Sequence, residues 1–277
     1  MIEFKNKIFT GANNRKSVFD AKISPDNKAV ILFVHGYKGY KDWGCWGLME
    51  EYFLQRNMGF VKFNFSHNGG TVAEPIDFPD LDAFGKNCFS YELEDLEIIT
   101  TEVHRLINQE LEAEIPIVLV GHSRGGGVAV LHASKNKYIT KIISLAGISS
   151  IGNRFPSGEE LEDWKNSGVR YVQNARTNQE MPHYFSFFED YQKNKEALNI
   201  EDAARSLNIP FVQIHGDMDL TVSITEGQYL ARWTNTNLVI VKGAGHTFGA
   251  KQPWNNNEMP ADMLEVCANM LAFIDDI

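Results

Sequence analysis

The sequence predicts an α/β fold, in which helices cover both faces of a mainly parallel central sheet. Two observations lead to this prediction. Short apolar runs rich in β-branched residues recur along the chain, and segments whose apolar residues have helical spacing separate them. A parallel sheet produces this alternation, because its strands are buried on both faces and are joined by helices. The chain has 277 residues, 43% of them hydrophobic, which suffices for a substantial core.

The N-terminal part supplies the first strands and helices of this pattern. Two weakly alternating stretches within about the first 25 residues predict antiparallel edge strands. Ala29–Val34 is an unbroken apolar run, which predicts a buried strand. A helix is predicted over Asp42–Arg56, because its large apolar residues fall on one face. Phe60–Phe65 alternates as a strand does, and Tyr91–Asn108 again has apolar residues at helical intervals.

The C-terminal part continues the alternation to the end of the chain. The strands expected there are Ile117–Val120, Ile139–Leu145, Phe211–Ile214 and Leu238–Val241. The helices expected with them are Val128–Ser134, Thr225–Trp233 and Met263–Ile274. Repeated strand–helix units of this kind build a parallel sheet, so the prediction of fold class rests on the whole chain.

One segment, Ser149–Asn199, interrupts the pattern. It holds a hairpin candidate that turns near Arg176–Asn178, followed by the aromatic-rich stretch HYFSFFEDYQKN. No glycine/serine linker flanks it, so we expect residues 1–277 to form a single domain with a cap or lid insertion at 149–199. We expect this cap over the carboxyl ends of the strands, with one or two aromatics facing substrate. The candidates are Trp164 and Tyr184, since each lies beside a polar or turn residue.

Composition excludes several classes of protein. A formal net charge of -10 and a sequence pI of about 5.3 repel phosphate backbones, so nucleic acid is not an expected partner. No stretch approaches the ~20 apolar residues that span a bilayer. The three cysteines are far apart, and no secretory signal is evident, so a reduced, cytoplasmic protein is expected. A signal removed beforehand would leave no trace, and the sequence does not indicate an oligomeric state.

The most informative stretch reads IVLVGHSRGGG and runs from Ile117 to Gly127. A strand followed by glycines could bind a dinucleotide, but that fingerprint requires G-x-G-x-x-G, and Ser123 occupies the place of the second glycine. The following strand ends in AGISS, without an acid to bind a ribose, and the phosphate-loop motif G-x-x-x-x-G-K-[ST] is absent. Nucleotide binding is therefore not expected.

The same residues match G-x-S-x-G, in which a sharp strand-to-helix turn exposes a serine. Gly121 and Gly125 flank Ser123, where side chains would collide with the neighbouring strand and helix. The helix that begins beside Ser123 has free N–H groups, which favour developing negative charge. The motif is short, so a glycine-rich turn with an incidental serine is the alternative, and the rest of the chain must supply a base and an acid.

Candidates for both partners follow the last two predicted strands. A serine hydroxyl needs a base to become a nucleophile, and the base needs an acid to orient it. His246 lies in the small-residue loop KGAGHTF after the last strand. The loop after the preceding strand reads HGDMD and offers Asp217 and Asp219. Asp219 is favoured as the triad acid because it emerges after the turn at Gly216, and Asp217 is expected to cap the loop.

The order Ser123, Asp219, His246 resembles that of the α/β-hydrolase superfamily, whose acid follows a G-x-x-D pattern matched here by Gly216 to Asp219. The resemblance extends from Ala29 through the last helix. FVHGYKGYKDWG is similar to the HG loop of that superfamily. The resemblance implies an oxyanion hole formed by the backbone N–H groups of Tyr37 and Arg124.

Within the superfamily the chain is most similar to small esterases near the dienelactone-hydrolase and feruloyl-esterase groups. The HG loop and the segment NARTNQEMP carry this likeness. Dienelactone hydrolases use cysteine as nucleophile, whereas this chain has Ser123, so that chemistry is not transferred. The side chain of Arg124 is expected to cap nearby carbonyl groups, and a salt bridge to an acidic ligand is the less favoured alternative.

The resulting hypothesis is a serine hydrolase that cleaves small-molecule carboxylic esters through an acyl-enzyme, with aryl or feruloyl-type esters as candidates. It requires no metal and no organic cofactor. A peptidase or amidase, and a thioesterase or acyltransferase, are alternatives with the same triad. A non-catalytic ligand-binding protein of the same fold is a third. A metal hydrolase would have to use His35, His67, His215 and Asp217, which form no tight ligand motif.

Overall fold

An eight-stranded sheet forms the centre of the molecule in the computed structural model, which describes residues 1–276. The strands lie in the order β1-β2-β4-β3-β5-β6-β9-β10. The strands are β1 (Ile2–Thr10), β2 (Lys16–Ile23), β3 (Val30–Val34), β4 (Gly59–Phe63), β5 (Ile117–His122), β6 (Ile139–Leu145), β9 (Phe211–Gly216) and β10 (Leu238–Val241). Within this sheet β3, β4, β5, β6, β9 and β10 run parallel, whereas at one edge β1 pairs antiparallel with β2, and β2 with β4. The predicted fold class is confirmed.

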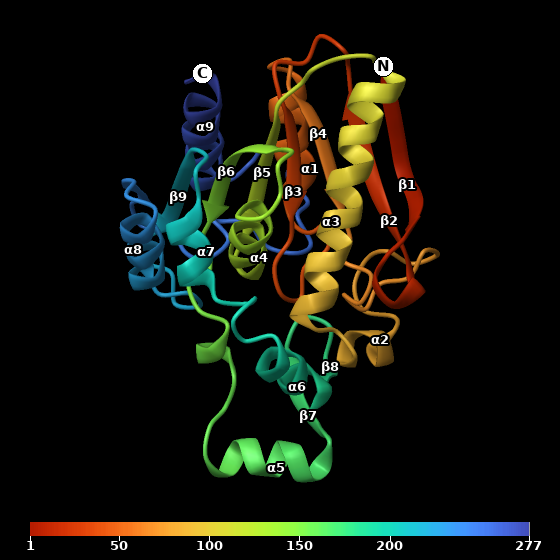
Figure 1. Cartoon of the computed structure of the whole chain (residues 1–277), viewed down its shortest axis with the longest axis vertical. Helices are drawn as coiled ribbons and strands as arrows, with labels where there is room; N and C mark the ends of the chain where they lie inside the picture. The colour runs from red at the N-terminus through yellow and green to blue at the C-terminus, as the bar shows by residue number, and fades with distance from the viewer. Residues whose placement is uncertain (277) are drawn as a thin grey trace.

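Helices cover both faces of this sheet (Figure 1). They are α1 (Trp46–Leu54), α3 (Phe89–Arg105), α4 (Arg124–Ala133), α7 (Ile200–Ser206), α8 (Ile224–Trp233) and α9 (Ala261–Asp275). Alternate residues of each strand face opposite sides, so the central strands contribute to two cores. In β3, Ile31 and Phe33 belong to the core with α1 and α9, whereas Leu32 and Val34 belong to the core with α3 and α4.

Two predicted helices differ from the structure by about a full helical turn at their starts. The helix expected from Asp42 begins only at Trp46, because Gly44 has a left-handed backbone with φ of 59° that ends any earlier helical turn. The helix expected from Val128 begins at Arg124, directly after the strand. Its first turn consists largely of glycines, which have a low helix propensity, so the apolar pattern did not show it, whereas the G-x-S-x-G motif indicated a helix that begins beside Ser123. Tertiary packing against the sheet overrides that propensity.

The segment expected to form a cap folds into a short 3-10 helix, two α-helices and a hairpin. Its elements are η3 (Gly152–Arg154), α5 (Glu159–Ser167), β7 (Val169–Asn174), β8 (Gln179–Tyr184) and α6 (Ser186–Lys193). The two strands pair antiparallel, and the chain turns between Asn174 and Gln179, so the predicted hairpin is confirmed. Figure 1 shows these elements beyond the carboxyl ends of the parallel strands, with α5 farthest from the sheet. The short helix α2 (Leu81–Gly85) lies against β8.

Aromatic packing attaches this cap to the rest of the molecule. Phe155 stacks against Trp164 and contacts Phe187, and Phe187 in turn stacks on Phe89 of α3. Trp164 and Phe187 are buried members of the main core. Burial of large aromatic side chains is worth several kcal/mol, so these contacts fix the cap against the sheet.

No helix within the described residues is long and apolar enough to cross a membrane. The three cysteines are free thiols, and all are buried.

Candidate active site

Ser123 lies at a sharp turn between β5 and α4 and has φ of 57° and ψ of -120°. A β-carbon at Gly121 would lie 2.2 Å from the carbonyl oxygen of Gly125, and one at Gly125 would lie 2.5 Å from the carbonyl oxygen of His35. Neither position can accept a side chain without moving backbone. These two glycines therefore allow the turn, and the turn holds the serine in a conformation that is costly for a non-glycine residue.

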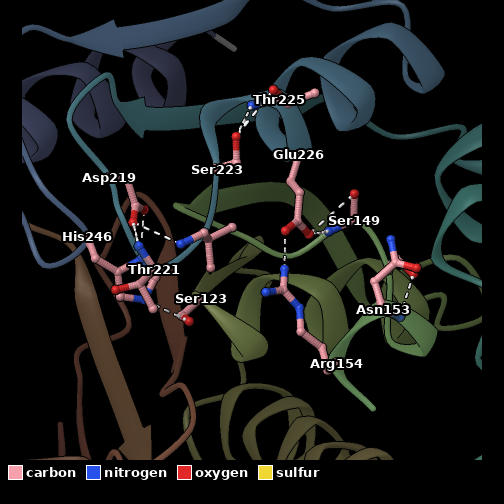
Figure 2. A network of polar contacts seen from close by, with 12 residues as sticks. Ser123, Ser149, Asn153, Arg154, Asp219, Thr221, Ser223, Thr225, Glu226 and His246 are labelled. Atoms are coloured by element: carbon pink, nitrogen blue, oxygen red, sulfur yellow. Dashed lines mark hydrogen bonds and ion pairs between the residues drawn. The ribbon is translucent and has the colours of Figure 1, made fainter. Parts of the chain in front are cut away.

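Three side chains from three loops meet at this turn (Figure 2). His246 Nε2 lies 2.9 Å from Ser123 Oγ, and His246 Nδ1 lies 2.8 Å from Asp219 Oδ2. A carboxylate can only accept, so the Nδ1 proton faces Asp219 and the Nε2 lone pair faces the serine hydroxyl. This tautomer is the one in which the imidazole can remove a proton from Ser123.

The carboxylate of Asp219 is buried and accepts several hydrogen bonds. Its Oδ1 accepts the backbone N–H groups of Thr221 at 2.8 Å and Val222 at 2.9 Å. Its Oδ2 also lies 3.3 Å from His215 Nε2. Burial alone would raise the pKa of Asp219, but the hydrogen bonds from His215, His246 and Val222 outweigh it and hold the pKa below its usual range. Asp219 is therefore ionised at neutral pH.

Asp217 has a different role in the same loop. Its Oδ1 accepts the backbone N–H of Gly243 at 2.6 Å, and the residue is exposed. This bond joins the loop after β9 to the loop after β10, as expected for a residue that caps the loop.

His122 supports the histidine of the site rather than the serine. Its Nε2 lies 2.9 Å from the carbonyl oxygen of His246, to which it donates. Burial, together with the positive charge that His246 can carry, lowers the pKa of His122 to about 3, so it stays neutral. His122 thus holds the backbone that positions the His246 imidazole.

The loop after β3 passes directly over Ser123. A β-carbon at Gly36 would lie 2.9 Å from Ser123 Cβ. His35 fixes this loop, because its Nε2 accepts the N–H of Phe65 at 3.2 Å and its Nδ1 donates to the carbonyl oxygen of Gly36 at 2.9 Å. The peptide unit is planar, so fixing this carbonyl also fixes the direction of the Tyr37 N–H.

The second expected donor is the backbone N–H of Arg124. Arg124 is the first residue of α4, where an N–H has no acceptor inside the helix. The oxyanion hole expected from these two N–H groups stays a prediction.

Two cavities flank the nucleophile, and both are lined by Ser123 and Tyr37. The first has a volume of about 240 Å³ and lies under the cap. Its other walls are formed by Arg124, Ile148, Arg154, Phe155, Trp164, Arg170, Val172, His183, Phe187, Thr221 and Val222. The second has a volume of about 250 Å³. Its other walls are formed by Gly36, Lys38, Gly39, Trp43, Trp46, His122, Asn174, Arg176, His246 and Thr247.

The two aromatic residues expected to contact substrate have different positions. Trp164 lines the first cavity and donates from Nε1 to the carbonyl oxygen of His183 at 2.7 Å. Tyr184 lies outside both cavities, contrary to the prediction. Its hydroxyl donates to Asp82 at 2.9 Å, and its ring covers Gly85. Successive side chains of β8 point to opposite faces, so His183 takes the inward position.

The side chain of Arg124 does not cap carbonyl groups, contrary to the expectation from sequence. It donates to Glu92 at 3.2 Å and lies over the ring of Tyr37, 4.5 Å from the centroid. Tyr37 in turn contacts the cap, with its hydroxyl 2.7 Å from His183 Nε2.

Sequence reasoning did not find Arg154, Arg170 or His183 as cavity residues. All three come from the cap, whose register no sequence pattern indicates. Among residues 1–276, no group of three or more histidine, cysteine, aspartate or glutamate side chains is arranged to hold a metal ion.

Comparison with known proteins identifies the class. Residues 31–263 match the model of the Alpha/beta hydrolase family, and the chain belongs to this family. It is similar to the monoacylglycerol lipase abhd6-B of Xenopus laevis, with 22% identity over 92% of this chain and 81% of the relative.

Solved structures share the fold at low identity. Est1E from Butyrivibrio proteoclasticus, with ferulic acid bound, has a TM-score of 0.72 and 15% identity, covering 100% of both chains. A dienelactone hydrolase from Anabaena variabilis has a TM-score of 0.64 and 15% identity, covering 99% of this chain and 97% of the other. The resemblance inferred from sequence is confirmed at the level of family and fold.

Proposed function

We propose that this protein is a serine hydrolase that cleaves carboxylic esters through an acyl-enzyme. The observation that supports this most strongly is the chain of short contacts from Ser123 through His246 to Asp219, at the mouth of two cavities. The similar lipase and the structural neighbour with bound ferulic acid support ester substrates.

In the first half of the reaction, Ser123 Oγ attacks the ester carbonyl carbon while His246 Nε2 accepts the hydroxyl proton. Asp219 stabilises the imidazolium, and the N–H groups of Tyr37 and Arg124 donate to the oxyanion. The bond from the carbonyl carbon to the alcohol oxygen then breaks. His246 gives its proton to that oxygen, the alcohol leaves, and the acyl group remains on Ser123.

In the second half, water attacks the acyl carbon and gives a proton to His246. The bond from that carbon to Ser123 Oγ breaks, and His246 returns the proton to the serine. The net reaction consumes one ester and one water and forms one carboxylic acid and one alcohol.

The two cavities receive different halves of the ester. His246 must protonate the leaving alcohol, and among these cavities it lines only the second. The alcohol therefore lies in the second cavity, where Trp43 and Trp46 suit an aryl group, and the acyl group lies in the first.

The test uses the purified protein with a fluorophosphonate probe and a panel of aryl, feruloyl, short-chain and long-chain esters. We expect covalent labelling at Ser123 and turnover of at least one ester. Amide and thioester analogues in the same panel separate the peptidase and thioesterase alternatives. A protein that neither reacts with the probe nor cleaves any ester would instead be a binding protein of this fold.

A further inference from the structure

Every charged residue that lines the first cavity is an arginine. Arg124, Arg154 and Arg170 contribute to its wall, and no aspartate or glutamate of the described chain does. The protein as a whole has a net charge of -10, so composition alone would favour acidic residues here. The small cavity beside Ser123 therefore gathers positively charged side chains, although acidic residues outnumber basic ones in the chain.

Two of these arginines are paired with acids that lie behind the wall. Arg124 pairs with Glu92, which is buried, and Arg154 pairs with Glu226 of α8 (Figure 2). Each pair holds its guanidinium in place and offsets most of its charge. The pairs use few of the five donors that each guanidinium has, and Arg154 Nε is buried with no partner among the described residues.

Arg170 is the arginine with the least compensated charge. Its carboxylate neighbour is Glu160, 3.6 Å away with a side chain 74% exposed, and solvent screens such a pair strongly. The guanidinium lies over the ring of Trp164, 5.1 Å from the centroid, which orients it within the cavity wall. The cavity thus has a surplus of about one positive charge.

The other titratable groups of this wall do not cancel that charge. His183 and Tyr37 bond to each other, and burial together with the nearby Arg124 and Arg170 lowers the pKa of His183 to about 3. His183 is therefore neutral at physiological pH, and it brings no negative charge to the cavity. The remaining wall includes Ile148 and Val172, which suit an aliphatic chain.

We infer that the acyl half of the substrate carries a carboxylate, so that the ester is a monoester of a dicarboxylic acid. This rests on the proposed function, in which the acyl group occupies the first cavity. Arg170 binds the free carboxylate through its planar fork, with donors of Arg124 or Arg154 in support. Hydrolysis consumes one water and releases the alcohol and the dicarboxylic acid.

The main experiment compares two esters that differ by one methyl group. The first is para-nitrophenyl hydrogen adipate, and the second is its neutral methyl ester, with succinate, glutarate and suberate analogues to vary chain length. We expect kcat/KM to favour the charged ester by about 10-fold or more at the best chain length, as one charge-assisted hydrogen-bond pair allows. Added salt should reduce the ratio of kcat/KM for the charged ester to kcat/KM for the neutral ester.

The outcomes separate this inference from the proposed function. Equal or slower cleavage of the charged ester at every chain length overturns the inference and leaves ester hydrolysis standing. Failure to cleave either ester while another ester in the panel is cleaved also overturns it. If no ester is cleaved and the fluorophosphonate does not react, the proposed function fails first.

A pair of arginine variants tests the assignment to Arg170. Arg170→Gln should lower the charged-to-neutral ratio of kcat/KM about 10-fold or more. Arg205→Gln removes a guanidinium from α7 that pairs with the exposed Glu201, and it should leave the ratio unchanged. An unchanged ratio in both variants would show that Arg170 is not the carboxylate ligand.

A binding measurement on the unmodified protein covers the case in which Arg170→Gln does not fold. Adipate should slow fluorophosphonate labelling at lower concentration than hexanoate does, because only adipate can reach the arginines while its other end lies at Ser123. Equal protection by both acids would contradict the inference.

Discussion

At the scale of single residues, the strained backbone of Ser123 depends on its glycine neighbours. The serine has positive φ, and a β-carbon at Gly125 would lie 2.5 Å from the carbonyl oxygens of both Val34 and His35. The glycine therefore allows α4 to begin directly after the strand and Ser123. Geometry that is costly for one residue is maintained by close packing around it.

Ser123→Ala should abolish ester hydrolysis, with kcat/KM reduced by about 10⁴-fold or more. The variant keeps the backbone and removes only the hydroxyl, so its thermal unfolding midpoint should remain near that of the parent. The measurements are kcat/KM for the best ester and a melting curve. Residual activity of a tenth of wild type with normal melting would exclude Ser123 as nucleophile.

The two acids of the loop after β9 should differ sharply. Asp219→Asn should reduce turnover by about 10⁴-fold, because an amide that donates to His246 favours the wrong tautomer. Asp217→Asn should have a far smaller effect, because Asp217 only accepts the N–H of Gly243. Steady-state kinetics of both variants decide the assignment, and a reversed order would show that Asp217 is the acid.

At the scale of secondary-structure elements, the parallel strands bring the reactive groups together. β5, β9 and β10 end at the same edge of the sheet, so the loops that follow them deliver Ser123, Asp219 and His246 to one point. The cap closes this edge from outside. It is tied to the loop after β3 by Tyr37 and His183, and to α8 by Arg154 and Glu226.

Within the cap, Trp164 and Tyr184 form a matched pair for mutation, since each side chain donates one hydrogen bond. Trp164→Phe should change the relative kcat/KM among acyl chain lengths, because it enlarges the first cavity and removes the hydrogen bond to the His183 carbonyl oxygen. Tyr184→Phe should leave that ranking unchanged, because Tyr184 bonds to Asp82 outside the cavities. An unchanged ranking in both variants would mean that the cap does not select the acyl group.

At the scale of the whole molecule, buried histidines link stability to pH. Burial lowers the pKa of His35 and His132 to about 4 and of His122 and His183 to about 3. In the unfolded chain a histidine titrates near about 6.5. Below that pH the unfolded state therefore binds more protons than the folded state, and stability falls as pH falls. Asp95 has the opposite effect on the pH dependence of stability. Burial raises its pKa to about 6, so its protonation favours the folded state as pH falls.

The free energy of unfolding should therefore decrease on acidification from about pH 7 to about pH 5, with each buried histidine contributing a slope of up to about 1.4 kcal/mol per pH unit. Urea unfolding at a series of pH values measures this. His132→Gln, far from the reactive serine and bonded to Thr100, should make the dependence shallower. A free energy of unfolding that stays constant or increases on acidification over this range would contradict this linkage between histidine protonation and stability.

Much of the architecture was predictable because it depends on local pattern. The bounds of β6 and β10 agree with the apolar runs that predicted them. The candidate triad was predictable because G-x-S-x-G and the order of the acid and the histidine are features of sequence. The apolar pattern did not show the glycine-rich start of α4, because close packing rather than helix propensity decides it, and only the G-x-S-x-G motif indicated a helix beside Ser123.

The sequence by itself therefore determined the sheet, the family and the order of the reactive residues, since strand periodicity and a short motif are properties of neighbouring residues. Only the tertiary structure decided which cap residues line the first cavity. His183 points inward and Tyr184 outward because of the orientation of β8, and no local pattern specifies that orientation. The arginines Arg154 and Arg170 meet Arg124 only after the cap packs on the sheet, because long-range packing places residues distant in sequence around one cavity.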